Sequence, residues 1–345
     1  ATSALPVRPS RLRLMALAGL ATPLIALGLW AGAGRSAPSP PHSAPSAPPA
    51  TSITPITPAE WIAIPAGSVR LGLDADAARA LYAECRRSPA EDCGPDFESS
   101  VFGRTALAAA QQPVPAFAIA AHEVSNLNFA QFLDARSGGL KLDPWPASGV
   151  LLRDADGHAL AATAAAANEA TPYGIERRDQ RIAPVAGRES AAASYLSWYA
   201  AGAYCQAQGA RLPSELEWEL AARGSEGRAF PWGNTLPDCR GVAFLGDRGD
   251  CGAARRSPVN VASSPLDRSP LGVLDLAGNV LEWTATRLDP RSRVDQEHCR
   301  SVGCAVTRGG SFLDRSVWLH AALRSRFKLS DVVDNVGFRC AKDLP

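Results

Sequence analysis

A proline-rich segment, residues 35–58, confines the folded part of this chain to the residues after it. The segment RSAPSPPHSAPSAPPATSITPITP consists mainly of proline, serine and alanine and has no acidic residue. Such a composition cannot bury a core and favours extended polyproline II conformations. The sequence therefore predicts three parts: an amino-terminal segment over residues 1–34, a linker over residues 35–58 and a folded domain over residues 59–345.

The amino-terminal segment has the pattern of an export signal. Arg8, Arg11 and Arg13 precede the uncharged run Leu14 to Gly34, which is about long enough to cross a bilayer. Arginines on this side predict an uncleaved anchor with its amino end in the cytoplasm. The small residues at 31–33 leave a cleaved signal peptide as the alternative. Both predict a domain in a bacterial periplasm, tethered to the inner membrane in the first case and released in the second.

The charge balance argues against nucleic acid as a partner. The chain has 35 basic and 34 acidic side chains, and the first 58 residues hold four arginines but no acid. The predicted domain therefore carries slightly more acidic than basic groups. A nucleic-acid-binding protein needs a broad basic surface instead.

The eight cysteines of an exported chain suggest disulfides. Eight cysteines allow 105 pairings, so spacing must choose among them. Three pairs are close enough in sequence to close single loops, and two cysteines are left over. The close pairs are Cys85 with Cys93, Cys239 with Cys251, and Cys299 with Cys304; Cys205 and Cys340 remain. No Cys-x-x-Cys or His-Glu-x-x-His motif occurs, which argues against zinc and redox-motif sites.

Helix signals are clearest around Ser214. Ser214 and Glu217 form a predicted capping box, in which each side chain accepts from the other residue's backbone N–H, and Leu216 and Leu220 face the core. The other expected elements are helices after Ser125 and Ser197, two strands meeting at a turn over 62–71, and a strand over 114–119.

The remaining segments predict loops. Residues 74–112 have the composition of an insertion, and residues 140–183 that of irregular surface structure, with an alanine-rich piece that could be helical. Beyond Gly224 the chain is dominated by glycines and aromatic turns. Early helices followed by strands and long loops indicate an α+β fold.

Eight sequence motifs, which follow one another along the chain, narrow the α+β prediction to one type of fold. They are IPAGSVRLG, HEVSNLNFAQF, SWYAAGAYC, RLPSELEWELAARG, FPWGN, DLAGNVLEW, RGGSF and NVGFRC. Together they resemble the formylglycine-generating enzyme, or sulfatase-modifying factor, family, and they extend over nearly all of residues 59–343. The resemblance implies a C-type-lectin-like fold that is poor in regular secondary structure and rich in long loops.

The resemblance also implies that the family's oxidation chemistry is lost. Active members use two cysteines after the GGS motif to bind copper and oxidise a substrate cysteine to formylglycine. Asp314 and Leu319 stand at these positions, and neither can supply a thiolate. We therefore expect no catalytic residue, no copper and no formylglycine-generating activity. Cys299 and Cys304 precede the GGS motif, so a loop disulfide is preferred there over a relocated active site.

Two structural features of the family are retained. One is a disulfide between Cys205 and Cys340. The other is a calcium loop with two side-chain oxygens and two backbone carbonyls, at Asp275, Gly278, Val280 and Glu282. The alternative for this loop is a pair of acids that cap a turn. A second family calcium site is expected to be empty, because Gly241 replaces its asparagine.

The family's substrate groove supplies the candidate binding site. Ser311 and Asn335 match groove positions, and the polar and aromatic residues around them are Asp314, Arg315, Trp318, His320, Arg324 and Arg326. Such a surface could bind a peptide or a glycan. The alternative is that Trp318 packs in the core and that an arginine forms an internal ion pair.

Two functions are compatible with these residues. The first is a tethered binding module for a peptide, a glycan or a partner protein. The alternative is a different metal-dependent oxidation of a peptide or a small metabolite, as in relatives that lack the cysteines. Iron would require two or three histidines and a carboxylate within reach, and only His320 lies beside the expected groove, which counts against iron.

Overall fold

The computed structural model describes most of the predicted domain. The described residues are 60–87, 93–98, 111–146, 149–164, 173–237, 241–245, 257–288, 299 and 303–345. The predicted export segment, the linker and the pair Cys239 and Cys251 lie outside them. The α+β prediction is confirmed, because the described strands form four separate sheets with helices packed between them.

A four-stranded sheet carries the candidate site. Its strand order is β12-β11-β10-β13, antiparallel except for the parallel pair β10 and β13. The strands are β10 (Leu281–Leu288), β11 (Cys304–Arg308), β12 (Arg324–Lys328) and β13 (Val336–Gly337). The 3-10 helix η4 (Ser316–Leu319) lies in the connection from β11 to β12.

Two small sheets contain the strands that the sequence predicted near the start of the domain. The segment over 62–71 forms β1 and β2, but they pair with other strands: β1 with β4, and β2 with β3. The single strand predicted over 114–119 is two strands, β3 and β4. The three-stranded sheet contains β1 (Trp61–Ile64), β4 (Phe117–Ala120) and β14 (Ala341–Asp343), and the two-stranded sheet β2 (Gly67–Arg70) and β3 (Gln111–Val114).

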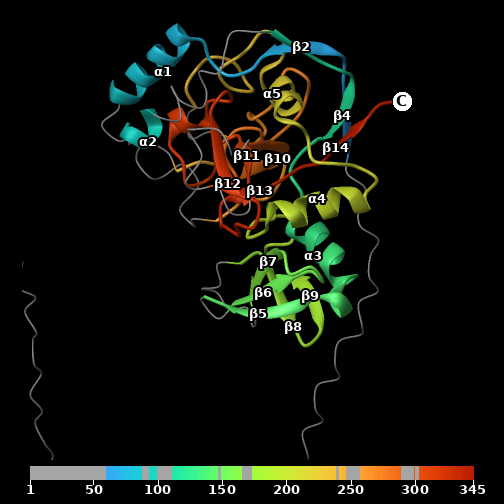
Figure 1. The fold of residues 1–345 in the computed structure, drawn as a ribbon. Coiled ribbons are helices and arrows are strands. Elements are labelled where there is room, and N and C mark those ends of the chain that lie inside the picture. The colour runs from blue at the N-terminus through green and yellow to red at the C-terminus, as the bar shows by residue number, and fades with distance from the viewer. Residues whose placement is uncertain are drawn as a thin grey trace, which may run out of the picture. The chain divides into compact units, whose positions relative to one another are not determined.

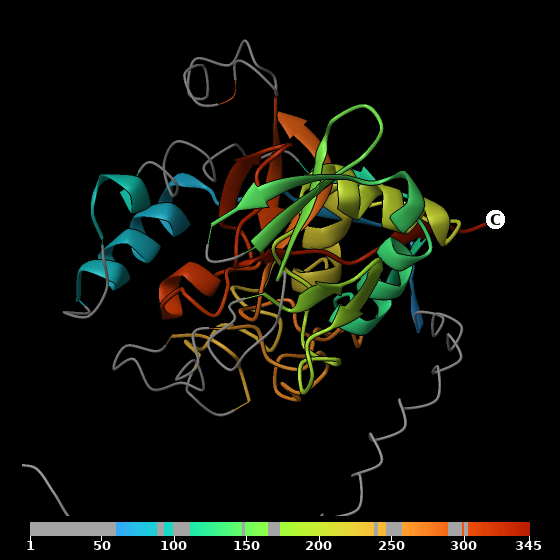
Figure 2. The same cartoon turned by 90° about the horizontal axis from the view of Figure 1, so that it is seen from below.

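The prediction of irregular surface structure over 140–183 is wrong. This segment forms a five-stranded sheet in chain order, and its central strand β7 is buried on both faces. In Figures 1 and 2 its green strands lie next to α3 and α4. The strands are β5 (Lys141–Trp145), β6 (Gly149–Arg153), β7 (Ala159–Ala164), β8 (Ile175–Arg178) and β9 (Arg181–Pro184).

The three predicted helices are confirmed, and each begins at its expected cap. Ser125 and Ser197 accept the backbone N–H three residues later, and Ser214 and Glu217 form the capping box. The helices are α3 (Asn126–Asp134), α4 (Trp198–Ala207) and α5 (Glu215–Arg223); a 3-10 turn, η2 (Ser137–Gly139), follows α3.

The insertion over 74–112 contains two further helices, α1 (Ala75–Arg87) and α2 (Pro95–Glu98). α1, at the upper left of Figure 1, packs against η4. The main core lies between α3, α4, the five-stranded sheet and β10, where Phe129, Tyr204, Leu160 and Trp283 meet. The insertion therefore supports the segment that carries the candidate site from outside the main core.

Candidate functional site

The two positions of the family's cysteines are filled by side chains that have other contacts. Leu319 is fully buried at the end of η4 and packs in an apolar cluster with Phe230, Phe244 and Ala277. Asp314 lies in the turn before η4 and accepts a hydrogen bond from the Ser311 hydroxyl at 2.6 Å. An isobutyl group in a core and a hydrogen-bonded carboxylate offer no soft ligand for copper.

Three of the predicted groove residues meet in one hydrogen-bonded chain. The Asn335 amide donates to Ser311 Oγ at 3.1 Å, and Ser311 in turn donates to Asp314. Ser311 is buried, whereas Asn335 and Asp314 are half-buried. Burial raises the pKa of Asp314, and the hydrogen bonds from Ser311 oppose this shift. Among the described residues Asp314 has no ion-pair partner, and the hydrogen bond that its carboxylate accepts comes from Ser311.

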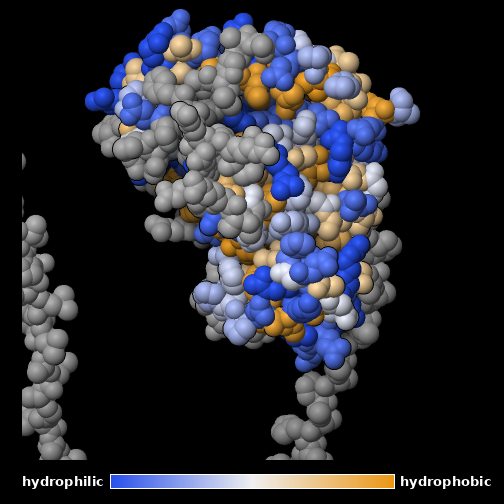
Figure 3. Space-filling view, viewed as in Figure 1, coloured by the Kyte–Doolittle hydropathy of each residue, from blue (hydrophilic) through white to orange (hydrophobic). Residues whose placement is uncertain are grey.

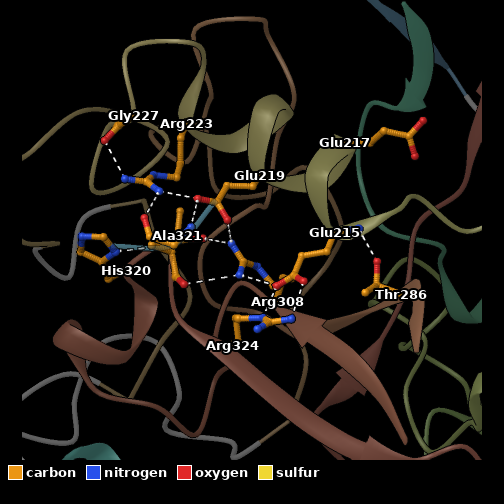
Figure 4. Close-up of polar contacts among 12 residues, drawn as sticks. Glu215, Glu217, Glu219, Arg223, Gly227, Thr286, Arg308, His320, Ala321 and Arg324 are labelled. Atoms are coloured by element: carbon orange, nitrogen blue, oxygen red, sulfur yellow. Dashed lines mark hydrogen bonds and ion pairs between the residues drawn. The ribbon is translucent and has the colours of Figure 1, made fainter. Parts of the chain in front are cut away.

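His320 and Arg324, also predicted for the groove, are buried, and Figure 4 shows Arg324 beside Glu215. Arg324 donates to Glu215 at 2.7 Å, and Arg308 bridges Glu215 and Glu219. Glu219 also accepts from Arg223 at the other end of α5. These side chains form a buried ion-pair network between α5 and the four-stranded sheet.

The other three predicted groove residues lie in η4, directly before it, and in β12. Trp318 packs edge-on against Phe97 of α2, with ring centroids 4.7 Å apart. Arg315 directly precedes η4, and Arg326 lies in β12 opposite Val306 of β11. The structure therefore joins Ser311, Asp314 and Asn335, and gives Trp318 a packing role toward the insertion.

The buried His320 should make stability depend on pH. Burial, together with the nearby Arg223 and Arg308, lowers the pKa of His320 to about 3, and the ring accepts the Ala322 N–H at Nδ1. Because the unfolded imidazole binds a proton near pH 6.5, the native state loses stability as the pH falls below that value. This histidine should cost about 2 kcal/mol between pH 7 and pH 5.

His320→Asn, which keeps an acceptor near the Nδ1 position, should remove that part of the pH dependence. Urea unfolding of both proteins at pH 7 and pH 5 measures the difference directly. Equal losses of stability in both proteins would mean that the native fold does not lower the pKa of His320.

The predicted calcium loop has a strained backbone. Asp275 and Asn279 have positive φ angles of 54° and 49°, and Gly278 has a φ of 87°. A Cβ atom at Gly278 would lie 2.3 Å from the Ala243 carbonyl oxygen, so only glycine fits there. Asp275 is buried, and one of its carboxylate oxygens has no hydrogen-bond partner. An unpartnered buried carboxylate oxygen is what a calcium ligand offers, so Asp275 fits the predicted site.

Glu282, the second predicted side-chain ligand, has other partners. Arg339 donates to both of its carboxylate oxygens at 2.7 Å, and Trp218 Nε1 donates to one of them at 2.9 Å. Two more buried acids that the sequence did not single out lie nearby, Glu123 and Asp267. Burial raises the pKa of both, and the charge of Asp275 adds to the shift.

Three disulfides are present among the described residues. Cys85 is bonded to Cys93 and Cys299 to Cys304, which confirms the two local pairs. The bond that the family resemblance implied, Cys205 to Cys340, is also present and joins α4 to the segment before β14. Cys299 and Cys304, the closely spaced pair that precedes the GGS motif, are bonded to each other, so neither is a free thiol.

No helix in the described part of the chain is long and apolar enough to span a membrane. On the face shown in Figure 3 the described surface alternates between hydrophilic and hydrophobic patches.

Comparison with known proteins agrees with the fold and the motifs. Residues 48–344 match the family described as sulfatase-modifying factor enzyme 1-like domain, so the chain belongs to this family. It is 39% identical over 153 residues to the inactive C-alpha-formylglycine-generating enzyme 2 of Mus musculus, covering 43% of this chain and 47% of that protein. It is 30% identical over 272 residues to the formylglycine-generating enzyme of Mycobacterium tuberculosis, covering 67% and 88%.

A solved structure shows the same fold. The structure of PvdO from Pseudomonas aeruginosa aligns with a TM-score of 0.52 at 19% identity, covering 85% of this chain and 97% of that one. The chain spans about half the length of the first curated relatives that it matches. The formylglycine-generating-enzyme type of fold predicted from the motifs is thereby confirmed.

Proposed function

We propose that this chain is a binding module of the family that does not form formylglycine. The observation that carries the proposal is the burial of Leu319 among Phe230, Phe244 and Ala277, at the position of a family cysteine. Asp314 at the other position accepts a hydrogen bond and can bind no soft metal. The likeness to a relative named as inactive supports the absence of formylglycine formation.

In this proposal the ligand contacts the half-buried Asp314 and Asn335, whose side chains the buried Ser311 joins. An amide, a hydroxyl and a carboxylate in one hydrogen-bonded chain suit a polar ligand such as a peptide or a glycan, or a partner protein. Export, a membrane tether and a structural calcium ion on the loop of Asp275 belong to the same proposal. A reporter fused after residue 345 that is active only in the cytoplasm would contradict export.

The purified domain should not convert a cysteine-containing sulfatase peptide to formylglycine. Incubation with copper and oxygen, followed by mass spectrometry of the peptide, should yield neither the aldehyde nor its hydrate, because the thiolate pair is missing. An active relative assayed beside it provides the positive control.

Turnover that disappears in Cys299→Ser would contradict this prediction and make the displaced pair an active site. Counting calcium, iron and copper per chain in the same preparation tests the alternative oxidation, since stoichiometric iron or copper would favour an enzyme. Calcium alone would favour the binding module.

A further inference from the structure

Cys85–Cys93 is the most accessible of the three disulfides in the described part of the chain. The four cysteines of the other two bonds are each at most 3% exposed, namely Cys205, Cys340, Cys299 and Cys304. Cys85 is fully buried as well, but Cys93 is only half-buried. In thiol–disulfide exchange a thiolate must reach one of the two sulfur atoms, so access decides which bond a reductant attacks first. Cys93 provides that access here.

The bond fixes the position of a very short helix. It joins Cys85, in the last turn of α1, to Cys93, two residues before α2; both helices lie at the left of Figure 1. α2 has four residues, too few for a helix that is stable in isolation. Its Phe97 is fully buried, stacked on Tyr82 of α1 at 6.4 Å and edge-on against Trp318 of η4 at 4.7 Å between ring centroids. The place of Phe97 therefore depends on the crosslink and on these two rings.

η4 is held from two sides by different parts of the chain. Val317 and Trp318 belong to the apolar cluster of the insertion, which also contains Phe97. Leu319 packs instead in a cluster of the domain that contains no residue of the insertion. Loss of the insertion contacts would therefore uncover Val317 and Trp318, while Leu319 would keep η4 attached to the domain.

η4 is also joined to the candidate site through the backbone. The Trp318 N–H donates to the Arg315 carbonyl at 3.0 Å. The Asp314 N–H donates to the Ser311 carbonyl, also at 3.0 Å. Because Asp314 and Arg315 are consecutive, the turn that holds Asp314 leads directly into η4. A change in the packing of η4 therefore reaches the Asp314 carboxylate.

We propose that Cys85–Cys93 is a redox-sensitive switch, whose reduction frees α2 from Trp318 and loosens η4 together with the turn at Asp314. That this changes ligand binding rests on the proposed function, in which Asp314 contacts the ligand. The reductant is a dithiol: one thiolate attacks Cys93 Sγ, the S–S bond breaks, and Cys85 leaves as a thiolate that takes up a proton. The second thiol then displaces Cys93 and closes the reductant's own disulfide, so two electrons and two protons pass to the protein.

Graded reduction followed by alkylation tests which bond opens first. The purified protein is treated with increasing concentrations of dithiothreitol, free thiols are blocked with iodoacetamide, and the peptides are mapped by mass spectrometry. Cys85 and Cys93 should be half alkylated at a dithiothreitol concentration at least about tenfold below that needed for either of the other two described bonds. Earlier alkylation of one of those bonds would overturn the proposal.

Hydrogen exchange tests what the opened bond releases. Where only Cys85–Cys93 is reduced, the amides of Trp318 and His320, which are bonded within η4 and its ends, should exchange at least about tenfold faster. The amides of α4, which the intact Cys205–Cys340 bond holds, should keep their rates. Removal of the reductant and re-oxidation should restore slow exchange. Unchanged exchange in η4 after reduction would make the bond a passive crosslink and would overturn the switch.

Two variants separate the crosslink from other effects of the reductant. The double variant Cys85→Ala, Cys93→Ala should exchange rapidly in η4 without dithiothreitol and show no further change with it. Phe97→Ala, which keeps the disulfide, should also open η4, because the ring contact with Trp318 is lost. A response of η4 to dithiothreitol in the double variant would assign the effect to another bond and contradict the proposal.

The reduction of the wild-type protein does not depend on whether either variant folds. Its readouts also require no ligand, so they test the switch apart from the proposed function. Formation of formylglycine by a protein that opens in this way would contradict the proposed function and leave the switch in place. The two failures are therefore distinguishable.

Discussion

Replacement of Arg308 by methionine should lower the free energy of unfolding by about 3–5 kcal/mol, since it removes the donor to several buried hydrogen-bond acceptors. Arg308 is fully buried and bridges Glu215 and Glu219 (Figure 4). Its guanidinium also donates to the carbonyls of Ala321 and Ala322, so methionine leaves four acceptors with fewer partners. Urea unfolding followed by tryptophan fluorescence measures the loss.

An exposed arginine provides the control for this experiment. Arg181 pairs with Asp134 at 2.8 Å, but its side chain is 64% exposed. Arg181→Met should therefore cost less than about 1 kcal/mol. A loss in Arg308→Met no larger than in the control would refute the idea that this network is electrostatically coupled.

The sequence predicted the ends of α5 but not the network on its buried face. The capping box has a local signature, because Ser214 and Glu217 are three residues apart. Glu215, Glu219 and Arg223 also share a helix face by their spacing, but that spacing is equally common on solvated helices. Their partner Arg308 is more than 80 residues away, and no local pattern connects it to α5.

The five-stranded sheet shows a different limit of sequence analysis. Its central strand β7 has the sequence ALAATA, and alanine favours helices over strands. All six residues are buried in the structure, so pairing with β6 and β8 and packing against α4 decide the conformation. Because both faces of this strand are covered, its sequence does not alternate between apolar and polar residues and therefore could not be recognised as a strand by that pattern.

The sequence located only some of the site residues, because contacts between distant parts of the chain leave no local pattern. Ser311, Asp314 and Asn335 lie in or next to family motifs, so the sequence located them and the structure joins them. Asp267 lies outside the eight family motifs, and Glu123 lies in a motif that carried no assigned role. Only the fold brings them to Asp275, since their approach depends on the loop's left-handed residues and on Arg339.

Removal of the Cys205–Cys340 bond should be the most destabilising change among the disulfides. The bond closes a sequence separation of 135 residues, whereas Cys85–Cys93 closes one of 8. In the chain-entropy account a crosslink stabilises by restricting the unfolded chain, more so for longer loops. This predicts a loss of about 4–5 kcal/mol for the double variant Cys205→Ala, Cys340→Ala, against about 2–3 kcal/mol for Cys85→Ala, Cys93→Ala.

Both pairs are largely buried, so the comparison keeps the change in packing similar while the loop length differs. Cys205 and Cys340 pack beside Phe129, Tyr204 and Phe338 in the main core, and their loss should lower the stability of the whole domain. The Cys85–Cys93 bond belongs to the insertion, whose cluster with Val317 should open first. Urea unfolding read by core tryptophans and by hydrogen exchange in α1 separates these effects. The opposite result would be a larger loss of global stability in Cys85→Ala, Cys93→Ala than in Cys205→Ala, Cys340→Ala. It would mean that the insertion, which packs against η4, controls the stability of the domain more than the long crosslink does.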